Sequence, residues 1–332
     1  MTTRKLIQFI LTGAYLLLAS VSAFASPVWA GQADTPPAAT PPAGTSAVAA
    51  PTQADVAYGK DSSHRLDFYK AAGTATKPGP TPVVIYFHGG GFVSGDKTDC
   101  KKDAWLSAYL AHGISVVSAN YRFISKHPFP APLEDGVRAV QYVRSRAAEW
   151  GIDPKRVALE GHSAGGCIAV WIATRDEQAK PDSADPVEKE SSRVCAALGH
   201  GAQTTLDPAV ILKEVGGNPK IHPSLQYIYN TTDGKPLDEK EKQARVKDAS
   251  ALEQVSKDDP PLWLGYSSEL KADPLPETAE MNLSIHNAKF GKLMKDRYTA
   301  AGLECVFQYK GGPAVDNELT FLAKILSPAT SK

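Results

Sequence analysis

The chain contains 332 residues, of which 42% are hydrophobic and 22% charged, and its 36 basic residues equal its 36 acidic ones. This composition is typical of a globular protein and argues against a nucleic-acid-binding or membrane-surface protein, which would carry an excess of positive charge. The length allows one large α/β domain or two ordinary ones.

Residues 1–25 have the pattern of a signal peptide. Arg4 and Lys5 precede an apolar run from Leu6 to about Val21, and small residues follow that run and allow cleavage. The alternative is an uncleaved anchor helix, but the apolar run is short for a membrane span. We therefore expect a secreted or periplasmic protein without stable membrane insertion after cleavage.

Residues 26–54 are rich in Pro and Ala and contain little that could be buried, which is typical of a flexible linker. No later stretch shows a comparable drop in complexity. We therefore expect one domain over residues 55–326.

Apolar runs and helical spacings alternate along this domain. After edge strands within 55–69, the pattern predicts strands at 82–87, 114–119, 156–160, 194–198, 261–266 and 303–309, and helices at 101–111, 133–150, 167–174, 287–301 and 318–326. Such alternation indicates an α/β fold with a mostly parallel central sheet, helices on both faces, and chemistry at the carboxyl ends of the strands. Residues 203–249 are hard to assign and could form a small cap.

The stretch from Gly161 to Gly165 has the form Gly-x-Ser-x-Gly and lies between a predicted strand and a predicted helix. A turn this tight excludes side chains at its flanking positions and leaves the serine protruding at the edge of the sheet. Ser163 is therefore the expected nucleophile.

A second glycine-rich motif, His88-Gly89-Gly90-Gly91, ends the strand predicted at 82–87. Glycines allow backbone N–H groups to approach a substrate oxygen closely, so Gly90, Gly91 and Ala164 are expected to form an oxyanion hole. We expect His88 to hold the loop rather than to move protons.

These motifs resemble the hormone-sensitive-lipase-like and the feruloyl- or acetylxylan-esterase-like (BD-FAE-like) branches of the α/β-hydrolase superfamily. The resemblance also includes Tyr121-Arg122 and the proline-rich stretch from His127 to Asp135. It implies the α/β-hydrolase fold and ester hydrolysis by a serine, a histidine and an acid, with no metal or organic cofactor.

The same resemblance suggests Asp273 as the acid, because Asp273-Pro274-Leu275 follows the strand predicted at 261–266; Glu269 is a weaker candidate. The expected histidine is missing. Where the family has it, after the last strand, this chain has Pro313, which has no side-chain proton acceptor.

Two histidines lie where they could replace it. His286 precedes the helix predicted at 287–301, whose positive end would keep the imidazole neutral, and His200 ends the strand predicted at 194–198. His286 is our choice, although it could simply cap or pack the helix.

The sequence therefore predicts a serine carboxylic-ester hydrolase acting on small-molecule or carbohydrate-linked esters, with its catalytic histidine relocated. The main alternative is a degenerate α/β-hydrolase that binds an ester or glycan without turnover; a peptidase is a weaker alternative. We expect the four cysteines to form no disulfide, with Cys100 alone near solvent.

Overall fold

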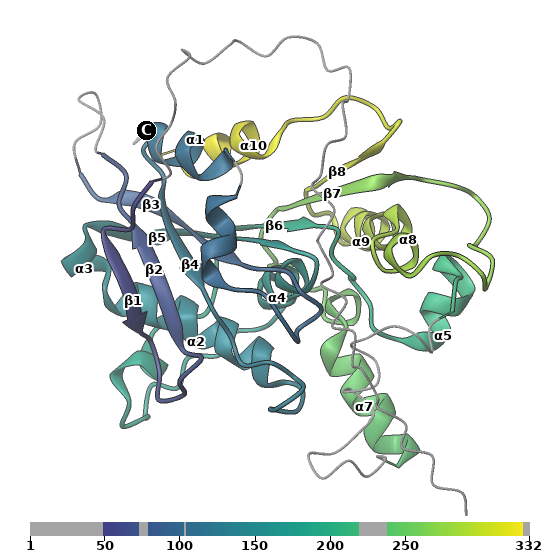
Figure 1. The fold of residues 1–332 in the computed structure, drawn as a ribbon, viewed down its shortest axis with the longest axis horizontal. Helices are drawn as coiled ribbons and strands as arrows, with labels where there is room; N and C mark the ends of the chain where they lie inside the picture. The colour runs from purple at the N-terminus through teal and green to yellow at the C-terminus, as the bar shows by residue number, and fades with distance from the viewer. Residues whose placement is uncertain (1–48, 73–78, 103, 219–237, 328–332) are drawn as a thin grey trace, which may run out of the picture. The chain divides into compact units, whose positions relative to one another are not determined.

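The computed structural model describes residues 49–72, 79–102, 104–218 and 238–327 (Figure 1). The expected signal peptide, most of the expected linker and part of the 203–249 segment lie outside these ranges. All described residues belong to one compact unit, Ser46–Lys332. Its first strand already begins at Gln53, at the end of the expected linker.

Within the described ranges, eight strands form one sheet in the order β1-β2-β4-β3-β5-β6-β7-β8. Strand β1 lies at one edge and is antiparallel to β2, which is antiparallel to β4, whereas each later neighbouring pair, from β4·β3 to β7·β8, is parallel. This confirms the mostly parallel sheet. The strands are β1 (Gln53–Ala57), β2 (Arg65–Tyr69), β3 (Thr81–Phe87), β4 (Ser115–Ala119), β5 (Ile152–His162), β6 (Ala196–His200), β7 (Leu262–Glu269) and β8 (Cys305–Lys310).

Helices cover both faces of this sheet, as the alternating pattern predicts. The longer ones are α1 (Trp105–Ala111), α2 (Ala131–Ser145), α4 (Ala164–Ala173), α7 (Glu239–Ala249), α9 (Ala288–Ala301) and α10 (Glu318–Ile325). The shorter helical segments are η1 (Lys97–Lys101), α3 (Ala147–Trp150), η2 (Pro186–Lys189), α5 (Pro208–Val210), η3 (Ile211–Val215), η5 (Ala251–Glu253) and α8 (Met281–Ile285). In the part of the chain that the structure describes, no helix is long and apolar enough to cross a membrane.

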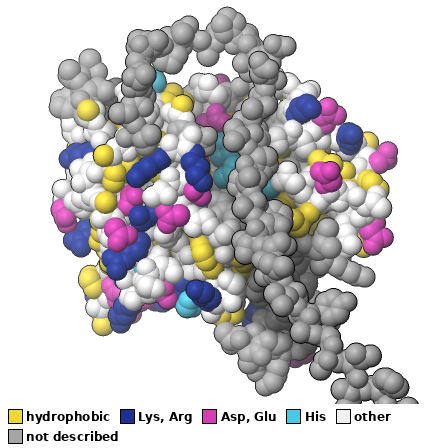
Figure 2. All heavy atoms as spheres, viewed as in Figure 1, with side chains coloured by type: hydrophobic (Ala, Val, Ile, Leu, Met, Phe, Trp, Pro, Cys, Tyr) yellow, Lys and Arg dark blue, Asp and Glu magenta, His cyan; other side chains and the backbone are white. Residues whose placement is uncertain are grey.

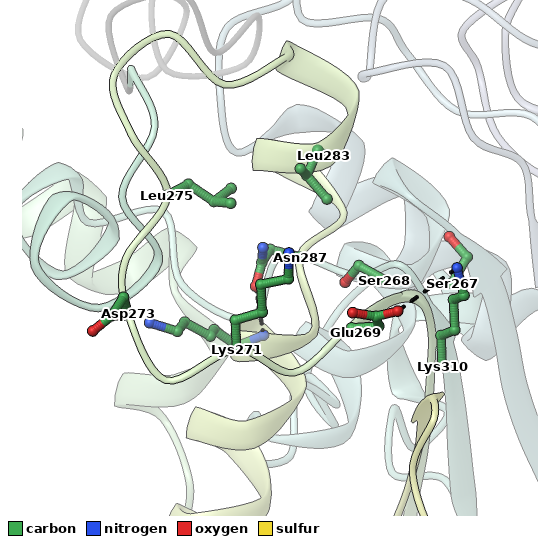
Figure 3. Close-up of a pocket in the computed structure, with 10 residues that line it drawn as sticks. Ser267, Ser268, Glu269, Lys271, Asp273, Leu275, Leu283, Asn287 and Lys310 are labelled. Carbon is green, nitrogen blue, oxygen red and sulfur yellow. Dashed lines mark hydrogen bonds and ion pairs between the residues drawn. The ribbon is translucent and has the colours of Figure 1, made fainter.

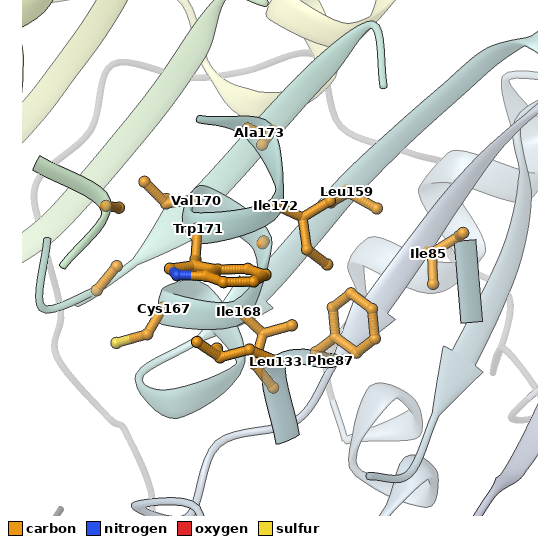
Figure 4. Packing of buried hydrophobic residues seen from close by; sticks show 14 of the residues in the cluster. Ile85, Phe87, Leu133, Leu159, Cys167, Ile168, Val170, Trp171, Ile172 and Ala173 are labelled. Atoms are coloured by element: carbon orange, nitrogen blue, oxygen red, sulfur yellow. The ribbon is translucent and has the colours of Figure 1, made fainter. Parts of the chain in front are cut away.

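The central strand β3 shows why the core has two layers. Its side chains alternate between the faces, so Ile85 and Phe87 join the cluster under α2, α4 and α9, whereas Val84 joins the cluster under α1 and α10. Figure 4 shows Phe87 among side chains of α4, including Ile168. Because its side chains are buried on both faces, β3 is held in a fixed position in the sheet. The start of the loop that follows β3 is thereby held in place.

The register of the parallel strands brings the two glycine motifs together. Phe87 at the end of β3 pairs with Gly161 of β5, and His162 pairs with His200 of β6. Carboxyl ends of parallel strands share one edge of a sheet, so the loops after β3, β5 and β6 meet there.

The cysteines correct one expectation. All four are free, but Cys100 is fully buried and its thiol contacts the Tyr69 hydroxyl at 3.7 Å. The polar sequence around Cys100 gave no sign that η1 packs over the sheet. Cys195 is the most exposed of the four.

Candidate active site

Ser163 sits on a strained turn between β5 and α4. Its φ of 52° and ψ of −115° lie where side-chain-bearing residues are rare, and its N–H donates to the His200 carbonyl at 2.7 Å. A Cβ on Gly161 would lie 2.2 Å from the Gly165 backbone, and one on Gly165 would lie 1.9 Å from the Phe87 carbonyl oxygen. Both flanking glycines are therefore required by close backbone approach, as the motif predicts.

The loop after β3 is held by the ring of His88. Its Nδ1 donates to the Gly89 carbonyl at 2.7 Å, and the ring stacks on Tyr121, whose hydroxyl donates to the His88 carbonyl at 2.8 Å. Burial lowers the pKa of His88, which favours the neutral ring. These contacts fit a structural role for His88.

The expected oxyanion-hole donors are available on this loop and on α4. Between described residues, no backbone hydrogen bond uses the N–H of Gly90 or Gly91. Ala164 is the first residue of α4, and the first N–H groups of a helix have no partner within it. The N–H groups of all three residues can therefore donate hydrogen bonds to a negatively charged oxygen.

The structure brings His286 to Ser163. His286 Nε2 lies 2.8 Å from Ser163 Oγ, which is hydrogen-bonding distance for a general base. His286 directly follows Ile285 and caps the C-terminal end of α8; it precedes Asn287, whose side chain caps α9. Two helix ends thus fix the backbone on either side of the imidazole.

The surroundings of His286 keep its imidazole neutral. Burial, and to a smaller extent the neighbouring His162, lowers the pKa of His286 to about 4. The two rings lie 6.1 Å apart between centroids. At neutral pH the Nε2 lone pair is therefore free to accept the serine proton. Figure 2 shows histidine side chains in the middle of the face viewed there, with acidic and basic side chains interspersed around them.

His200, the other candidate, is engaged elsewhere. Its Nε2 lies 2.9 Å from the buried carboxylate of Glu160, and its ring packs against Trp263 at 5.1 Å. Its contribution to the serine turn is the backbone carbonyl that receives the Ser163 N–H. This geometry favours His286 over His200 as the partner of Ser163.

The structure does not bring Asp273 to the imidazole. Its exposed side chain lines a hollow of 310 Å³ beyond the end of β7, together with Lys271, Glu269 and Asn287. In Figure 3 its carboxylate points away from the other labelled residues. Glu269 instead lies 3.9 Å from Lys310. Neither carboxylate shows a hydrogen bond to His286 among the described contacts.

The residue that does contact the second imidazole nitrogen is Asn282. Its Oδ1 lies 2.8 Å from His286 Nδ1. Sequence reasoning missed this residue because it searched for a carboxylate. The available signal was the spacing of four residues, which places two side chains on one face of a helical turn. Pro313 lies on an exposed stretch after β8, and its position carries no base.

No cluster of three or more His, Cys, Asp or Glu side chains suited to a metal ion occurs among the residues that the structure describes. The site brings together a serine, a neutral histidine and backbone N–H groups. A nucleophile, a base and oxyanion donors in this arrangement can carry out acyl transfer.

Comparison with known proteins gives matches of two kinds. The model of the BD-FAE family matches residues 66–275, well over half of the chain. Esterase LipI of Mycobacterium tuberculosis is 46% identical over 94 residues, which cover 28% of this chain and 29% of that protein. The sequence alignment thus spans less than a third of the relative's length.

Solved structures resemble the chain over more of its length. An acetyl ester-xyloside bifunctional hydrolase from Caldicellulosiruptor lactoaceticus gives a TM-score of 0.57 at 22% identity, covering 79% of this chain and 82% of that one. A truncated carbohydrate esterase from gut microbiota gives 0.58 at 20% identity, covering 79% and 88%. At this identity the likeness establishes the fold, which is the expected α/β-hydrolase fold.

Proposed function

Because the chain belongs to the BD-FAE family, whose model spans both glycine motifs, we propose that it is a serine carboxylic-ester hydrolase with Ser163 as nucleophile and His286 as base. The observation that carries the proposal is the 2.8 Å distance between His286 Nε2 and Ser163 Oγ. The family match ends at residue 275, so the base lies in a segment that this match does not cover.

The reaction starts with attack of Ser163 Oγ on the acyl carbon of the ester. His286 Nε2 takes the hydroxyl proton, and the carbonyl oxygen becomes an oxyanion that accepts hydrogen bonds from the N–H groups of Gly90, Gly91 and Ala164. When the tetrahedral intermediate collapses, protonated His286 donates to the departing alcohol oxygen. An acyl-serine remains.

Water then completes the cycle. His286 Nε2 takes a proton from a water molecule, whose oxygen attacks the acyl carbon. The second intermediate collapses to the free carboxylic acid, and His286 returns its proton to Ser163 Oγ. The cycle balances as one ester and one water converted to one acid and one alcohol.

The substrate class that we propose is an acyl ester on a carbohydrate. Support comes from the acetyl ester-xyloside bifunctional hydrolase and the carbohydrate esterase whose folds resemble this chain. Met281 and Leu283 on α8, near His286, are 43% and 41% exposed and offer apolar surface to an acyl or aryl group. The apolar N-terminal run supports action outside the cytoplasm.

The test compares the wild type with Ser163→Ala, His286→Ala and the control His112→Ala. His112 is an exposed histidine at the end of α1. We expect hydrolysis of a short aryl ester and of acetylated xylan fragments by the wild type and the control, complete loss in Ser163→Ala, and a fall of about 10²–10⁴-fold in His286→Ala.

A serine-reactive fluorophosphonate probe separates this function from the non-catalytic alternative. Labelling of the wild type at Ser163 supports the enzyme, because labelling needs an activated serine. A folded wild type that neither reacts with the probe nor turns over any ester would identify a binder. Labelling that survives in His286→Ala and vanishes in His200→Ala would make His200 the base.

A further inference from the structure

The second ring nitrogen of His286 faces an amide instead of a carboxylate. His286 Nδ1 lies 2.8 Å from Asn282 Oδ1, and the backbone N–H of His286 donates to the Asn282 carbonyl at 3.1 Å. Both contacts belong to the single turn of α8. Backbone and side chain thus fix the imidazole relative to the same residue.

These two contacts select one tautomer of the imidazole. Asn282 Oδ1 can only accept, so Nδ1 carries the proton and Nε2 keeps its lone pair towards Ser163. A carboxylate in a Ser-His-Asp triad performs this orientation and also stabilises the imidazolium that forms during the reaction. An amide oxygen can perform the first task but supplies no negative charge for the second.

We propose that Asn282 is the positioning residue of the catalytic histidine and that a neutral amide replaces the acid of the triad. The proposal rests on the proposed function, in which Ser163 attacks and His286 accepts its proton. It explains how the chain holds the base without the loop that carries Asp273.

The other groups around His286 leave this role to Asn282. On the strand side, the imidazole faces Gly201 and the ring of His162. On the β7 side, Ser268 Oγ donates to the backbone carbonyl of His286 at 3.5 Å, so this contact involves the backbone and not the imidazole ring. Gln203, which follows β6, donates its side-chain amide to the Ile285 carbonyl.

The charges near the imidazole agree with a neutral partner. Burial and His162 both lower the pKa of His286, to about 4, and no carboxylate contributes to the shift. Glu280, the residue before α8, is exposed, and so is Asp273. A carboxylate at hydrogen-bonding distance from Nδ1 would raise the pKa instead.

The experiment compares Asn282→Asp and Asn282→Ala with Asn317→Asp. Asn317 is an exposed residue whose side-chain oxygen caps α10, so its conversion to Asp makes the same charge change and keeps the cap. The readout is kcat/KM for a short aryl ester between pH 3.5 and 8.5, with thermal melting to establish folding. The acidic limb of this profile reports the protonation of His286 in the free enzyme.

We expect the two Asn282 variants to differ in kind. Asn282→Asp keeps an acceptor oxygen and adds a charge, so the acidic limb should move to higher pH by about 1–3 units while the rate at pH 8 is retained or increased. Asn282→Ala removes the acceptor, so kcat/KM should fall about three- to tenfold at all pH values, the worth of a neutral hydrogen bond. Asn317→Asp should behave as the wild type.

The outcomes separate the two proposals. A folded wild type without Ser163-dependent turnover or labelling overturns the proposed function. An active wild type whose Asn282→Ala variant keeps full kcat/KM, and whose Asn282→Asp variant keeps the wild-type acidic limb, overturns the role of Asn282 alone. A purely structural role would lower the melting temperature without moving the limb, and that result also overturns it.

Discussion

His162 offers a quantitative test of the electrostatics around the base. Its exposed ring lies 6.1 Å from that of His286, so a protonated His162 opposes a second positive charge there. Two unit charges about 6 Å apart interact by about 0.7 kcal/mol in water and about 2.7 kcal/mol at an effective dielectric constant of about 20. Those energies correspond to about 0.5 and 2 pKa units.

The perturbation is His162→Gln, which removes the charge and keeps a polar side chain. Protonation of His286 then becomes easier, so its pKa should rise above the present value of about 4. The acidic limb of kcat/KM should move to higher pH by about 0.5–2 units, nearer the lower figure because His162 is exposed and screened by water. Burial remains, so the limb should stay below the usual imidazole pKa of about 6.5.

The assay follows hydrolysis of a short aryl ester at constant ionic strength, with product measured after quenching at one fixed pH. His112→Gln is the matched control, because His112 is exposed and its ring bonds locally, to the Ala108 carbonyl. Raising the salt concentration should shrink the shift between wild type and His162→Gln. An unmoved limb, or one that moves to lower pH, would refute the electrostatic reasoning.

Two further substitutions test the site and its scaffold. Asp273→Asn should change kcat/KM at pH 8 by no more than about twofold, because the carboxylate is exposed and makes no hydrogen bond to His286 among the described contacts. A hundredfold loss would instead show that Asp273 acts as the acid of the triad. Gly165→Ala should lower the free energy of unfolding by about 1–3 kcal/mol or more, because the added Cβ would lie 1.9 Å from the Phe87 carbonyl oxygen. A urea unfolding midpoint equal to that of the wild type would contradict this clash.

The parts of the fold that follow from local rules were predictable from the sequence. The run predicted at 82–87 became β3 (Thr81–Phe87), and the helix predicted at 287–301 became α9 (Ala288–Ala301). Periodicity and glycine motifs carry this information because both depend on neighbours along the chain. The helix expected over 133–150 is instead interrupted between α2 and α3 at Arg146, which the apolar spacing did not indicate.

The residue that contacts the second nitrogen of His286 could not be predicted from local sequence patterns. Asp273 was suggested by a loop that resembles the family, yet the path of the chain after β7 leaves its side chain in solvent. Asn282 approaches the imidazole because α8 forms just before α9, and that placement depends on tertiary contacts such as those of Gln203 with the Ile285 carbonyl and of Ser268 with the His286 carbonyl. His286 itself was predictable as a helix-end histidine, but its distance to Ser163 needed the tertiary structure.

The single turn of α8 fixes the spacing between His286, the proposed base, and Asn282, which contacts its ring. An α-helix rotates by about 100° per residue, so one residue inserted or deleted between Asn282 and His286 would swing the amide off the ring. Side chains elsewhere on α8, such as exposed Leu283, can change without breaking that contact. In proteins that descend from this chain, we expect the other residues of α8 to vary. We expect the four-residue spacing between Asn282 and His286 to be conserved.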